Sequence, residues 1–258
     1  MSNPYEDILK DKRGYVAAWP INKVAVMIVS GGLDSIITCA RLMEDQGITI
    51  YPLHIERGQT NYLAEKQSIQ TFSKVFKKRY PRLFKPVSYI KLNVPPTEFK
   101  PNLSEYTKKH GHPMRDTVLQ IAAVQYAVSL KSQGVTAKTI YCAVMPEDYF
   151  PHSNIESIRA TNVAVCQNMD DWEWLITSPN IDLNLTDRPI SKSDEIIWAH
   201  KHNLPIGLTV SCNVATAETN LLNCGDCSSC NRRRAAFVEA NTPDITEYYS
   251  DGHTKSNT

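Results

Sequence analysis

One β-loop-α-β unit near the amino end constrains the fold more than any other part of the sequence. Six consecutive apolar residues, Val24–Val29, are typical of a strand buried on both faces of a parallel sheet. The segment Ser30–Ser35 (SGGLDS) follows, and apolar residues at helical spacing continue over Ile36–Gln46 until Gly47 ends the helix. A second apolar strand, Ile48–Ile55, completes the unit. The short loop therefore lies between the carboxyl end of a buried strand and a helix N-terminus.

The SGGLDS loop has the properties of a phosphate site. Two glycines let backbone N–H groups approach an anion, and the helix N-terminus adds positive potential. The loop has neither the spacing of a Walker A motif nor the G-x-G-x-x-G of a dinucleotide fold. We predict that Ser30 and Ser35 donate hydrogen bonds to a pyrophosphate group and that Asp34 lies near its Mg²⁺. A glycine turn with a serine or aspartate helix cap is the alternative interpretation.

The rest of the chain alternates predicted helices with predicted strands. In the first half we expect a helix over Tyr62–Arg79, a strand over Val87–Leu92, a polar loop over Pro95–Gly111 that covers the site, and a helix over Thr117–Gln133 whose core face holds Val118, Ile121, Ala122, Val128 and Leu130. In the second half we expect a strand over Thr139–Met145, a helix over Asn154–Met169, a strand over Trp174–Thr177, and a helix that begins with the cap-like Ser191–Asp194 and turns Ile196, Ile197 and Ala199 inward. This order predicts an α/β fold with a doubly wound, Rossmann-like parallel sheet.

We divide the chain into four segments. Residues 1–22 are an amino-terminal extension without a strong period, which we expect on the surface and to which we assign no function. Residues 23–205 form the nucleotide-binding domain, residues 206–241 a cysteine-containing segment, and residues 242–258 a polar, frayed tail.

Composition limits the partners and the compartment. A formal net charge of +1 over 258 residues gives no basic surface for nucleic acid, so we expect no nucleic-acid partner. No apolar run is long enough to span a membrane, and the polar amino end does not read as a signal peptide, which predicts a cytoplasmic protein. In that compartment seven cysteines are thiols or metal ligands rather than disulfides. Three of them, Cys39, Cys142 and Cys166, are interpreted as small buried apolar residues.

The other four cysteines form a predicted metal site. Two residues separate Cys224 from Cys227 and Cys227 from Cys230, and eleven residues separate Cys212 from Cys224. Four sulfurs suit tetrahedral Zn²⁺, and the glycine and serines between them allow the chain to turn around the ion. An iron-sulfur cluster and a redox or sulfur-relay pair are the alternatives.

Loop and cysteines together resemble one family. The loop resembles that of the ATP pyrophosphatase (PP-loop) superfamily, whose members split ATP between the α- and β-phosphates. The cysteine pattern with Arg233 and Phe237 after it resembles the carboxyl end of the 7-cyano-7-deazaguanine synthases, the QueC family of queuosine biosynthesis. Gly58-Gln59, Pro113-x-Arg115 and Lys192 match further family positions, so the resemblance covers about Val24 to Phe237.

The resemblance implies a fold of the adenine nucleotide alpha hydrolase type and an ATP-dependent, AMP-forming ligase. Its cofactors would be Mg²⁺ and a structural Zn²⁺, and it would convert 7-carboxy-7-deazaguanine and ammonia, through an adenylate and an amide, to 7-cyano-7-deazaguanine, as a homodimer. The implied catalytic residues are Asp34, Arg115 and Lys192, the ATP-binding residues Val29, Ser30, Gly31, Gly32, Leu33, Asp34, Ser35 and His54, the substrate-binding residues Arg57, Gln59, Asp148, His152 and Arg233, and the metal ligands Cys212, Cys224, Cys227 and Cys230. A surface ion pair for Arg115 and Lys192, and a satisfied core histidine for His54, are the alternatives.

Departures from the family pattern concern substrate choice. The family usually has tyrosine at the position of Arg57, asparagine at that of Asp116, and tyrosine-proline-aspartate-cysteine where this chain has Phe150–Ser153. The lost aspartate would be a natural partner for a guanine-like edge. A divergent enzyme that couples a deazaguanine carboxylate to an amine on a protein partner, for example in a defence system, is therefore the second interpretation. A non-catalytic nucleotide-binding module and a tRNA-modifying PP-loop enzyme are further alternatives.

Overall fold

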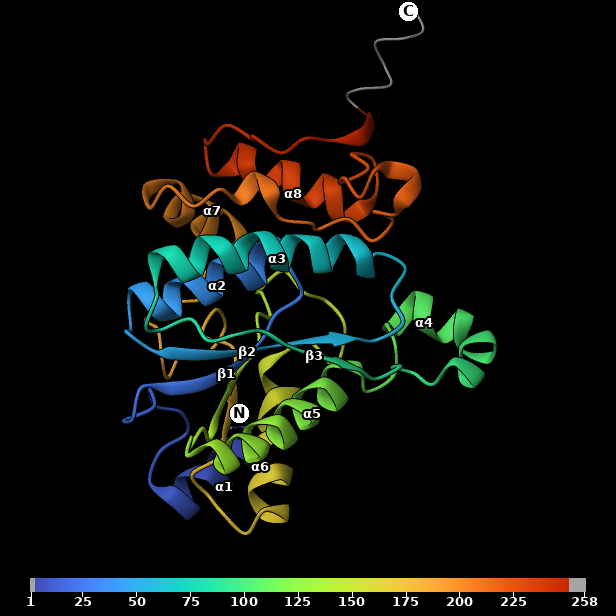
Figure 1. Ribbon diagram of the computed structural model, residues 1–258. Helices are drawn as coiled ribbons and strands as arrows, with labels where there is room; N and C mark the ends of the chain where they lie inside the picture. The colour runs from blue at the N-terminus through green and yellow to red at the C-terminus, as the bar shows by residue number, and fades with distance from the viewer. Residues whose placement is uncertain (1–2, 251–258) are drawn as a thin grey trace, which may run out of the picture.

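The computed structural model describes residues 3–250, and its centre is a five-stranded parallel sheet (Figure 1). The strand order is β3-β2-β1-β4-β5, and every neighbouring pair is parallel. The strands are β1 (Val24–Ile28), β2 (Thr49–Glu56), β3 (Ser88–Lys91), β4 (Thr139–Tyr141) and β5 (Leu175–Thr177). The chain builds outward from β1 to β3 and then returns to β4, so the carboxyl ends of β1 and β4 flank the topological switch point, where α/β sheets bind ligands. The predicted doubly wound α/β fold is confirmed.

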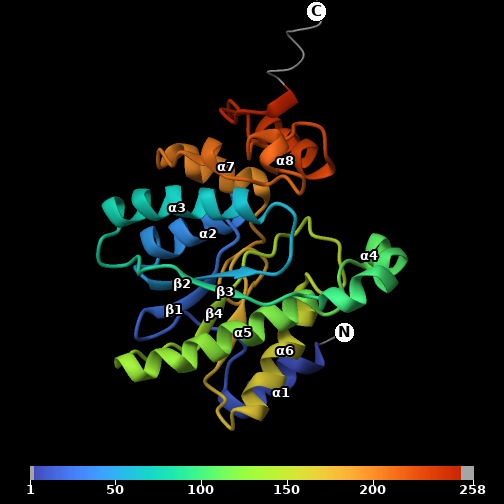
Figure 2. The ribbon, with the colours of Figure 1, turned by 45° about the vertical axis from the view of Figure 1, so that its right-hand side comes forward.

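Helices cover both faces of the sheet. The α-helices are α1 (Pro4–Arg13), α2 (Leu33–Glu44), α3 (Tyr62–Arg79), α4 (Ser104–His110), α5 (Arg115–Ser129), α6 (Ile155–Asn168), α7 (Lys192–Lys201) and α8 (Ser228–Glu239), and the 3₁₀ turns are η1 (Thr97–Leu103), η2 (Leu130–Gln133), η3 (Ile206–Leu208) and η4 (Ala217–Thr219). Figures 1 and 2 show α2, α3, α7 and α8 on one side of the sheet and α1, α5 and α6 on the other. Within the described residues 3–250, no helix is long and apolar enough to cross a membrane.

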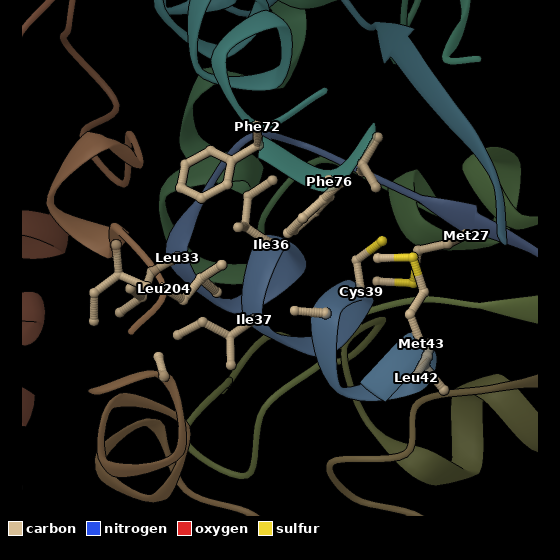
Figure 3. Close-up of a cluster of buried hydrophobic side chains, with 14 of the residues drawn as sticks. Met27, Leu33, Ile36, Ile37, Cys39, Leu42, Met43, Phe72, Phe76 and Leu204 are labelled. Atoms are coloured by element: carbon tan, nitrogen blue, oxygen red, sulfur yellow. The ribbon is translucent and has the colours of Figure 1, made fainter. Parts of the chain in front are cut away.

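The core on the α2 side fixes the position of the phosphate loop. Leu33, Ile36 and Ile37 of α2 are at most 2% exposed and share one buried cluster with Phe72 and Phe76 of α3, in which Ile36 lies beside the two rings (Figure 3). Burial of one such side chain contributes roughly 1.5–3 kcal/mol. Because Leu33 is the first residue of α2, this packing anchors the helix directly after the loop.

The segment over Pro95–Gly111 is not the polar loop that the sequence suggested. It forms η1 and α4, and neither contains a buried residue. Without an apolar face there is no helical periodicity to detect. Local contacts such as the Lys108 Nζ to Glu105 Oε1 ion pair of 2.6 Å are visible only in the structure.

The amino-terminal extension is also more than a surface segment. Asn3 caps α1 by accepting a hydrogen bond from Tyr5 N (3.1 Å), and Leu9 is completely buried against the α5–α6 side of the core. Arg13 donates to Trp174 O at 2.7 Å just before β5. Figure 2 shows α1 beside α6. The prediction missed this helix because its apolar stripe is short.

Two predicted core positions are wrong. Ile121 of α5 and Ile197 of α7 are 42% and 50% exposed. The inward face of α5 is formed by the small residues Ala122, Ala123 and Ala127, which let the helix approach the sheet closely. The other named core positions of these helices are buried or partly buried.

The first part of the expected tail is ordered against the cysteine segment. Residues 242–250 return along it, and Tyr248, 4% exposed, pairs with Asn223 in an isolated parallel bridge. Thr246 is 8% exposed and contacts Arg233. A frayed tail is therefore wrong for residues 242–250, and residues 251–258 lie outside the described part of the chain.

Candidate active site

The phosphate loop is held in a conformation that requires glycine. Gly31 has φ of 77°, and a Cβ there would lie 2.6 Å from the carbonyl oxygen of Glu65 in α3. Ser68 Oγ donates to Gly31 O at 2.7 Å, which binds the loop to α3. Within the loop, the Ser30 and Ser35 hydroxyls lie 3.1 Å apart, and no side chain caps α2. A capped glycine turn does not account for this arrangement.

Two adjoining cavities meet at this loop. The sheet cavity, about 330 Å³, has an inner wall of apolar residues at the strand ends, including Val29, Ile55 and Ala143. The helix cavity, about 450 Å³, extends toward Lys192 of α7 and Glu239 of α8. Both cavities are lined by Ser30, Gly32, Asp34, Arg57, Arg115, Asp148, Asn213, Ser229 and Arg232. The loop thus forms part of the wall that the two cavities share.

Lys192 forms an ion pair with Asp34 of the loop. A capping box, in which Ser191 and Asp194 bond each other's backbone N–H, fixes the start of α7 and hence the position of Lys192. Burial alone would lower the pKa of the Lys192 ammonium, but the Asp34 carboxylate more than offsets it, so the pKa is raised. Lys192 is therefore cationic at neutral pH. The surface-ion-pair alternative does not fit, because the Lys192 side chain is only 18% exposed.

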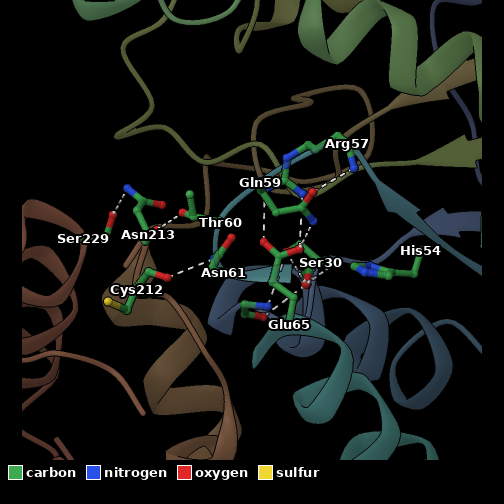
Figure 4. A network of polar contacts seen from close by, with 12 residues as sticks. Ser30, His54, Arg57, Gln59, Thr60, Asn61, Glu65, Cys212, Asn213 and Ser229 are labelled. Atoms are coloured by element: carbon green, nitrogen blue, oxygen red, sulfur yellow. Dashed lines mark hydrogen bonds and ion pairs between the residues drawn. The ribbon is translucent and has the colours of Figure 1, made fainter. Parts of the chain in front are cut away.

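Arg57 is oriented by a buried carboxylate (Figure 4). Its NH1 and NH2 groups donate to Glu65 Oε2 and Oε1 at 3.2 and 3.0 Å, and Gln59 Nε2 donates to Glu65 Oε2 at 2.6 Å. Glu65 is 3% exposed. Arg57 lines both cavities, whereas Gln59 is in the lining of neither described cavity. Gln59 helps to hold Arg57 in position, because its Oε1 accepts the Arg57 backbone N–H at 2.8 Å.

Asp116 is the centre of a second polar cluster. Arg115 Nε donates to Asp116 Oδ1 at 2.7 Å, and Ser153 Oγ donates to Asp116 Oδ2 at 2.5 Å. His152 Nε2 lies 3.9 Å from Asp116 Oδ2, and burial lowers the His152 pKa, which leaves the imidazole neutral at pH 7. His152 stacks on Phe150 and lines neither of the two described cavities. Although the segment Phe150–Ser153 has no aspartate of its own, the carboxylate of Asp116 lies beside His152 and Ser153 of this segment.

His54 and Arg233 have supporting contacts. His54 is 1% exposed, its Nδ1 lies 2.8 Å from Val29 O, and its ring stacks on Tyr62. It is absent from the linings of the two described cavities, which favours the core-histidine alternative. Arg233 lies in the wall of the helix cavity but is 1% exposed and donates to Thr209 Oγ1, Ser211 Oγ, Ile206 O and Thr246 Oγ1 at 2.7–3.1 Å. These bonds connect α8 to the segments on either side.

Asp148 lines both cavities, and its role in substrate binding stays a prediction. Its Oδ2 accepts the Met145 N–H at 3.0 Å. Burial, followed by the charge of Asp34, raises the pKa of Asp148. Sequence reasoning missed Glu65, Asn213, Ser229 and Arg232, which belong to α3 and the cysteine segment. Of these only Arg232 carried a signal, because it lies in an arginine run two residues after Cys230.

The four predicted metal ligands come together. All four sulfurs lie within 4.8 Å of one another, and three pairs are 3.5, 3.8 and 3.9 Å apart. With a Zn–S bond of about 2.3 Å, a tetrahedron has S–S edges of about 3.8 Å. Backbone N–H groups of Val214 and Cys224 point at Cys212 Sγ (3.3 and 3.4 Å), and the Cys230 thiol helps lower the Cys212 pKa to about 5. The residues fit a tetrahedral thiolate metal site.

The cysteine-containing segment, residues 206–241, is called the metal segment. Its backbone is connected to the candidate active site. Asn61 Nδ2 donates to Cys212 O at 2.9 Å, and Thr60 Oγ1 donates to Asn213 O at 2.9 Å (Figure 4). Asn213 Nδ2 in turn donates to Ser229 Oγ at 3.0 Å. The segment therefore forms one wall of the crevice and lies against the start of α3.

The parallel sheet, the SGGLDS loop at its switch point and the adjoining cavities are the features of a protein of the PP-loop superfamily. The family model for "Queuosine biosynthesis protein QueC" matches residues 24–241. Because this match covers most of the chain, the protein belongs to the QueC family.

Similar proteins agree with this assignment. The chain is 29% identical over 235 residues to the 7-cyano-7-deazaguanine synthase of Oceanobacillus iheyensis, which covers 88% of this chain and 98% of that one. It is 29% identical over 238 residues to that of Acetivibrio thermocellus, with 87% and 97% covered. A solved tRNA thiolase from Methanococcus maripaludis with its 4Fe-4S cluster is similar at 14% identity and a TM-score of 0.38, with 95% and 80% covered; a similarity this distant supports no conclusion about function or metal.

Proposed function

We propose that the protein is an ATP-dependent ligase that adenylates 7-carboxy-7-deazaguanine and converts it, with ammonia, to 7-cyano-7-deazaguanine. The observation that carries this proposal is the position of the glycine-dependent phosphate loop on the wall shared by two cavities. Cavities of about 330 and 450 Å³ are in the lower range for small-molecule sites. Two ligands that meet at one phosphate site are what transfer of an adenylyl group to a carboxylate requires.

The walls favour one assignment of the ligands. The apolar strand ends of the sheet cavity, such as Val29 and Ile55, suit the flat adenine base of ATP. The helix cavity, with Lys192 and Arg233 in its wall, is assigned to the acid. Asp148 lies between them and is the carboxylate placed to accept N–H groups from a guanine-like edge.

The proposed reaction activates the same carbon atom twice, each time with one ATP. A carboxylate oxygen of the acid attacks the α-phosphorus of ATP, the bond to the bridging oxygen breaks, and pyrophosphate leaves toward the loop. Ammonia then attacks the acyl carbon, AMP leaves, and the nitrogen gives up one proton, which yields the amide. The amide oxygen attacks the α-phosphorus of a second ATP with release of pyrophosphate. AMP then leaves with that oxygen while the nitrogen gives up its two remaining protons, which yields the nitrile. Activation is needed because a carboxylate oxygen is a poor leaving group and AMP a good one.

The residues of the chain support these steps by position and charge. Hydroxyls of Ser30 and Ser35 and the ammonium of Lys192 are placed to stabilise charge on the departing pyrophosphate. Asp34, now paired with Lys192, is the carboxylate that would hold Mg²⁺, which neutralises phosphate charge when bound. The four cysteines are assigned to a structural Zn²⁺ outside the reaction itself.

A single incubation tests the proposal. Purified protein is mixed with ATP, Mg²⁺, 7-carboxy-7-deazaguanine and ammonium, and the small molecules and intact protein are analysed by mass spectrometry. We expect the nitrile, AMP and pyrophosphate, and omission of the acid should prevent AMP formation. An amide-linked mass on a protein without nitrile would favour the divergent enzyme instead. Failure to consume the acid would contradict the assigned substrate.

A further inference from the structure

Arginine 232 differs from every other cation in the wall shared by the cavities. Arg57 is paired with Glu65 and Arg115 with Asp116, while Lys192, in the helix cavity, is paired with Asp34. Each of these positive charges is therefore largely neutralised by a carboxylate already present. Arg232 lines both cavities, and no carboxylate within residues 3–250 forms an ion pair with it.

The contact that Arg232 does make is a weak one. Its guanidinium carbon lies 5.9 Å from the ring centroid of Tyr149, and that tyrosine is 70% exposed. A cation–π contact at an exposed site contributes about 0.5–1 kcal/mol. A charge-assisted bidentate bond to phosphate is stronger and is the geometry that guanidinium favours. The Arg232 guanidinium would therefore gain free energy if it left its contact with the Tyr149 ring and bound a phosphate group instead.

The fold fixes where Arg232 lies. It is in the first turns of α8, two residues after the metal ligand Cys230 and next to the buried Arg233, whose hydrogen bonds lock the helix. One turn earlier, Ser229 reaches the same shared wall. The metal segment thus holds a cation in the wall that the two cavities share, and this wall also includes the phosphate loop residues Ser30 and Asp34.

We propose that Arg232 binds the phosphates of ATP and the departing pyrophosphate, and that the metal segment serves to position it. This inference rests on the proposed function for its ligand. It gives the metal segment a role in catalysis beyond stability, because Arg232 supplies, at the wall that both cavities share, a positive charge that no carboxylate within residues 3–250 neutralises. Arg232 is then a catalytic residue in addition to those of the loop.

The test measures binding and turnover separately in three variants. Arg232→Met removes the charge, and Arg232→Lys keeps a charge without the planar fork. Arg82→Met removes an exposed arginine that lies beyond the end of α3 and in the lining of neither described cavity. Binding of inorganic pyrophosphate and of ATP with Mg²⁺ is measured by calorimetry. Zinc content and melting temperature check that each variant is folded, and the rate of AMP formation gives kcat and KM.

For Arg232→Met we expect a pyrophosphate Kd raised on the order of tenfold to a hundredfold, as for loss of a hydrogen bond between charged groups. Arg232→Lys should recover part of this affinity, and Arg82→Met should bind as the wild type does. Unchanged binding in Arg232→Met, equal weakening in Arg82→Met, or no pyrophosphate binding by the wild type would each overturn the inference. A wild type that binds pyrophosphate but does not consume the acid would refute the proposed substrate, and the ratio of Kd values would still decide the role of Arg232.

Discussion

Lys192 at the first position of α7 is paired with Asp34 at the start of α2, across the mouth of the phosphate loop. The two residues are 158 positions apart. Lys192 would have to release Asp34 to bind a phosphate, and Asp34 would have to release Lys192 to bind a cation. Thr38 Oγ1 and Asn180 Nδ2 donate to the buried Glu195 nearby (2.8 and 3.2 Å), and burial raises the Glu195 pKa. Asp34 is the carboxylate that forms the ion pair with Lys192.

Replacement of Lys192 tests this pair. Because Lys192 would stabilise charge that develops in the transition state, Lys192→Met should lower kcat by about 10²–10³-fold with a smaller effect on KM, and Lys192→Arg should lower it less. Pyrophosphate release under saturating ATP is the measurement. Lys201→Met, at the exposed end of the same helix, is the matched control and should keep its rate. A Lys192→Met variant with normal kcat would show that the pair is structural only.

The metal site gives a second prediction. We expect one zinc per chain and no visible absorbance, because the sulfur positions suit a single tetrahedral ion. Cys227→Ser should bind no zinc and accumulate as insoluble protein, since metal binding and folding are coupled. Cys39→Ala, which removes a buried thiol of α2, should retain the metal. Substantial iron and sulfide in the purified protein would contradict the assignment.

Sequence reasoning reached the fold and the metal site because their signals are local. The apolar run of β1, the glycines of the loop and the spacing of Cys224, Cys227 and Cys230 each lie within a few residues. Gly31 is the clearest case, because only glycine fits a positive φ so close to the Glu65 carbonyl. Conversely, α4 has no buried residue and therefore no periodic pattern to recognise.

The sequence did not predict which side chains would contact the site residues, because these contacts join distant parts of the chain. Nothing near Arg57 in the sequence indicates that Glu65 will bind both of its terminal nitrogens, and nothing near Asp116 indicates Ser153. These contacts join separate elements, α3 to the end of β2 and α5 to the segment before α6. A comparison with the family pattern showed Asp116 and His152 as two separate changes, and the structure shows them as neighbours.

A buried ion pair leads to a stability prediction. Arg159 of α6 and Asp182 are both fully buried, with Arg159 NH2 at 2.6 Å from Asp182 Oδ1, and Thr177 Oγ1 donates to Asp182 Oδ2 at 2.5 Å. Arg159→Met would leave the Asp182 charge without its partner, which costs roughly 3–5 kcal/mol in unfolding free energy. Urea unfolding measures the loss. Arg188→Met breaks an exposed pair with Asp194, so its cost in unfolding free energy should be much smaller. Equal costs for the two variants would contradict the role of burial.

The last prediction concerns acid sensitivity through His54. Burial lowers the pKa of this imidazole, so below its unfolded pKa of about 6.5 the unfolded chain binds a proton that the folded chain does not. Stability that is present above pH 6.5 is therefore lost as the pH falls toward the lower folded-state pKa. Burial lowers the pKa values of His112 and His152 in the same direction.

We expect the urea midpoint of the wild type to fall between pH 7.5 and pH 5.5, and to fall less in His54→Gln. Glutamine can keep a donor for Val29 O, now 2.8 Å from His54 Nδ1, but cannot take up a proton in this range. Glu56→Gln, at the end of the same strand, changes a partly exposed carboxylate and controls for the substitution itself. If His54→Gln loses as much stability as the wild type over this range, or if the wild type becomes more stable in acid, the buried neutral imidazole is not the source of the acid sensitivity.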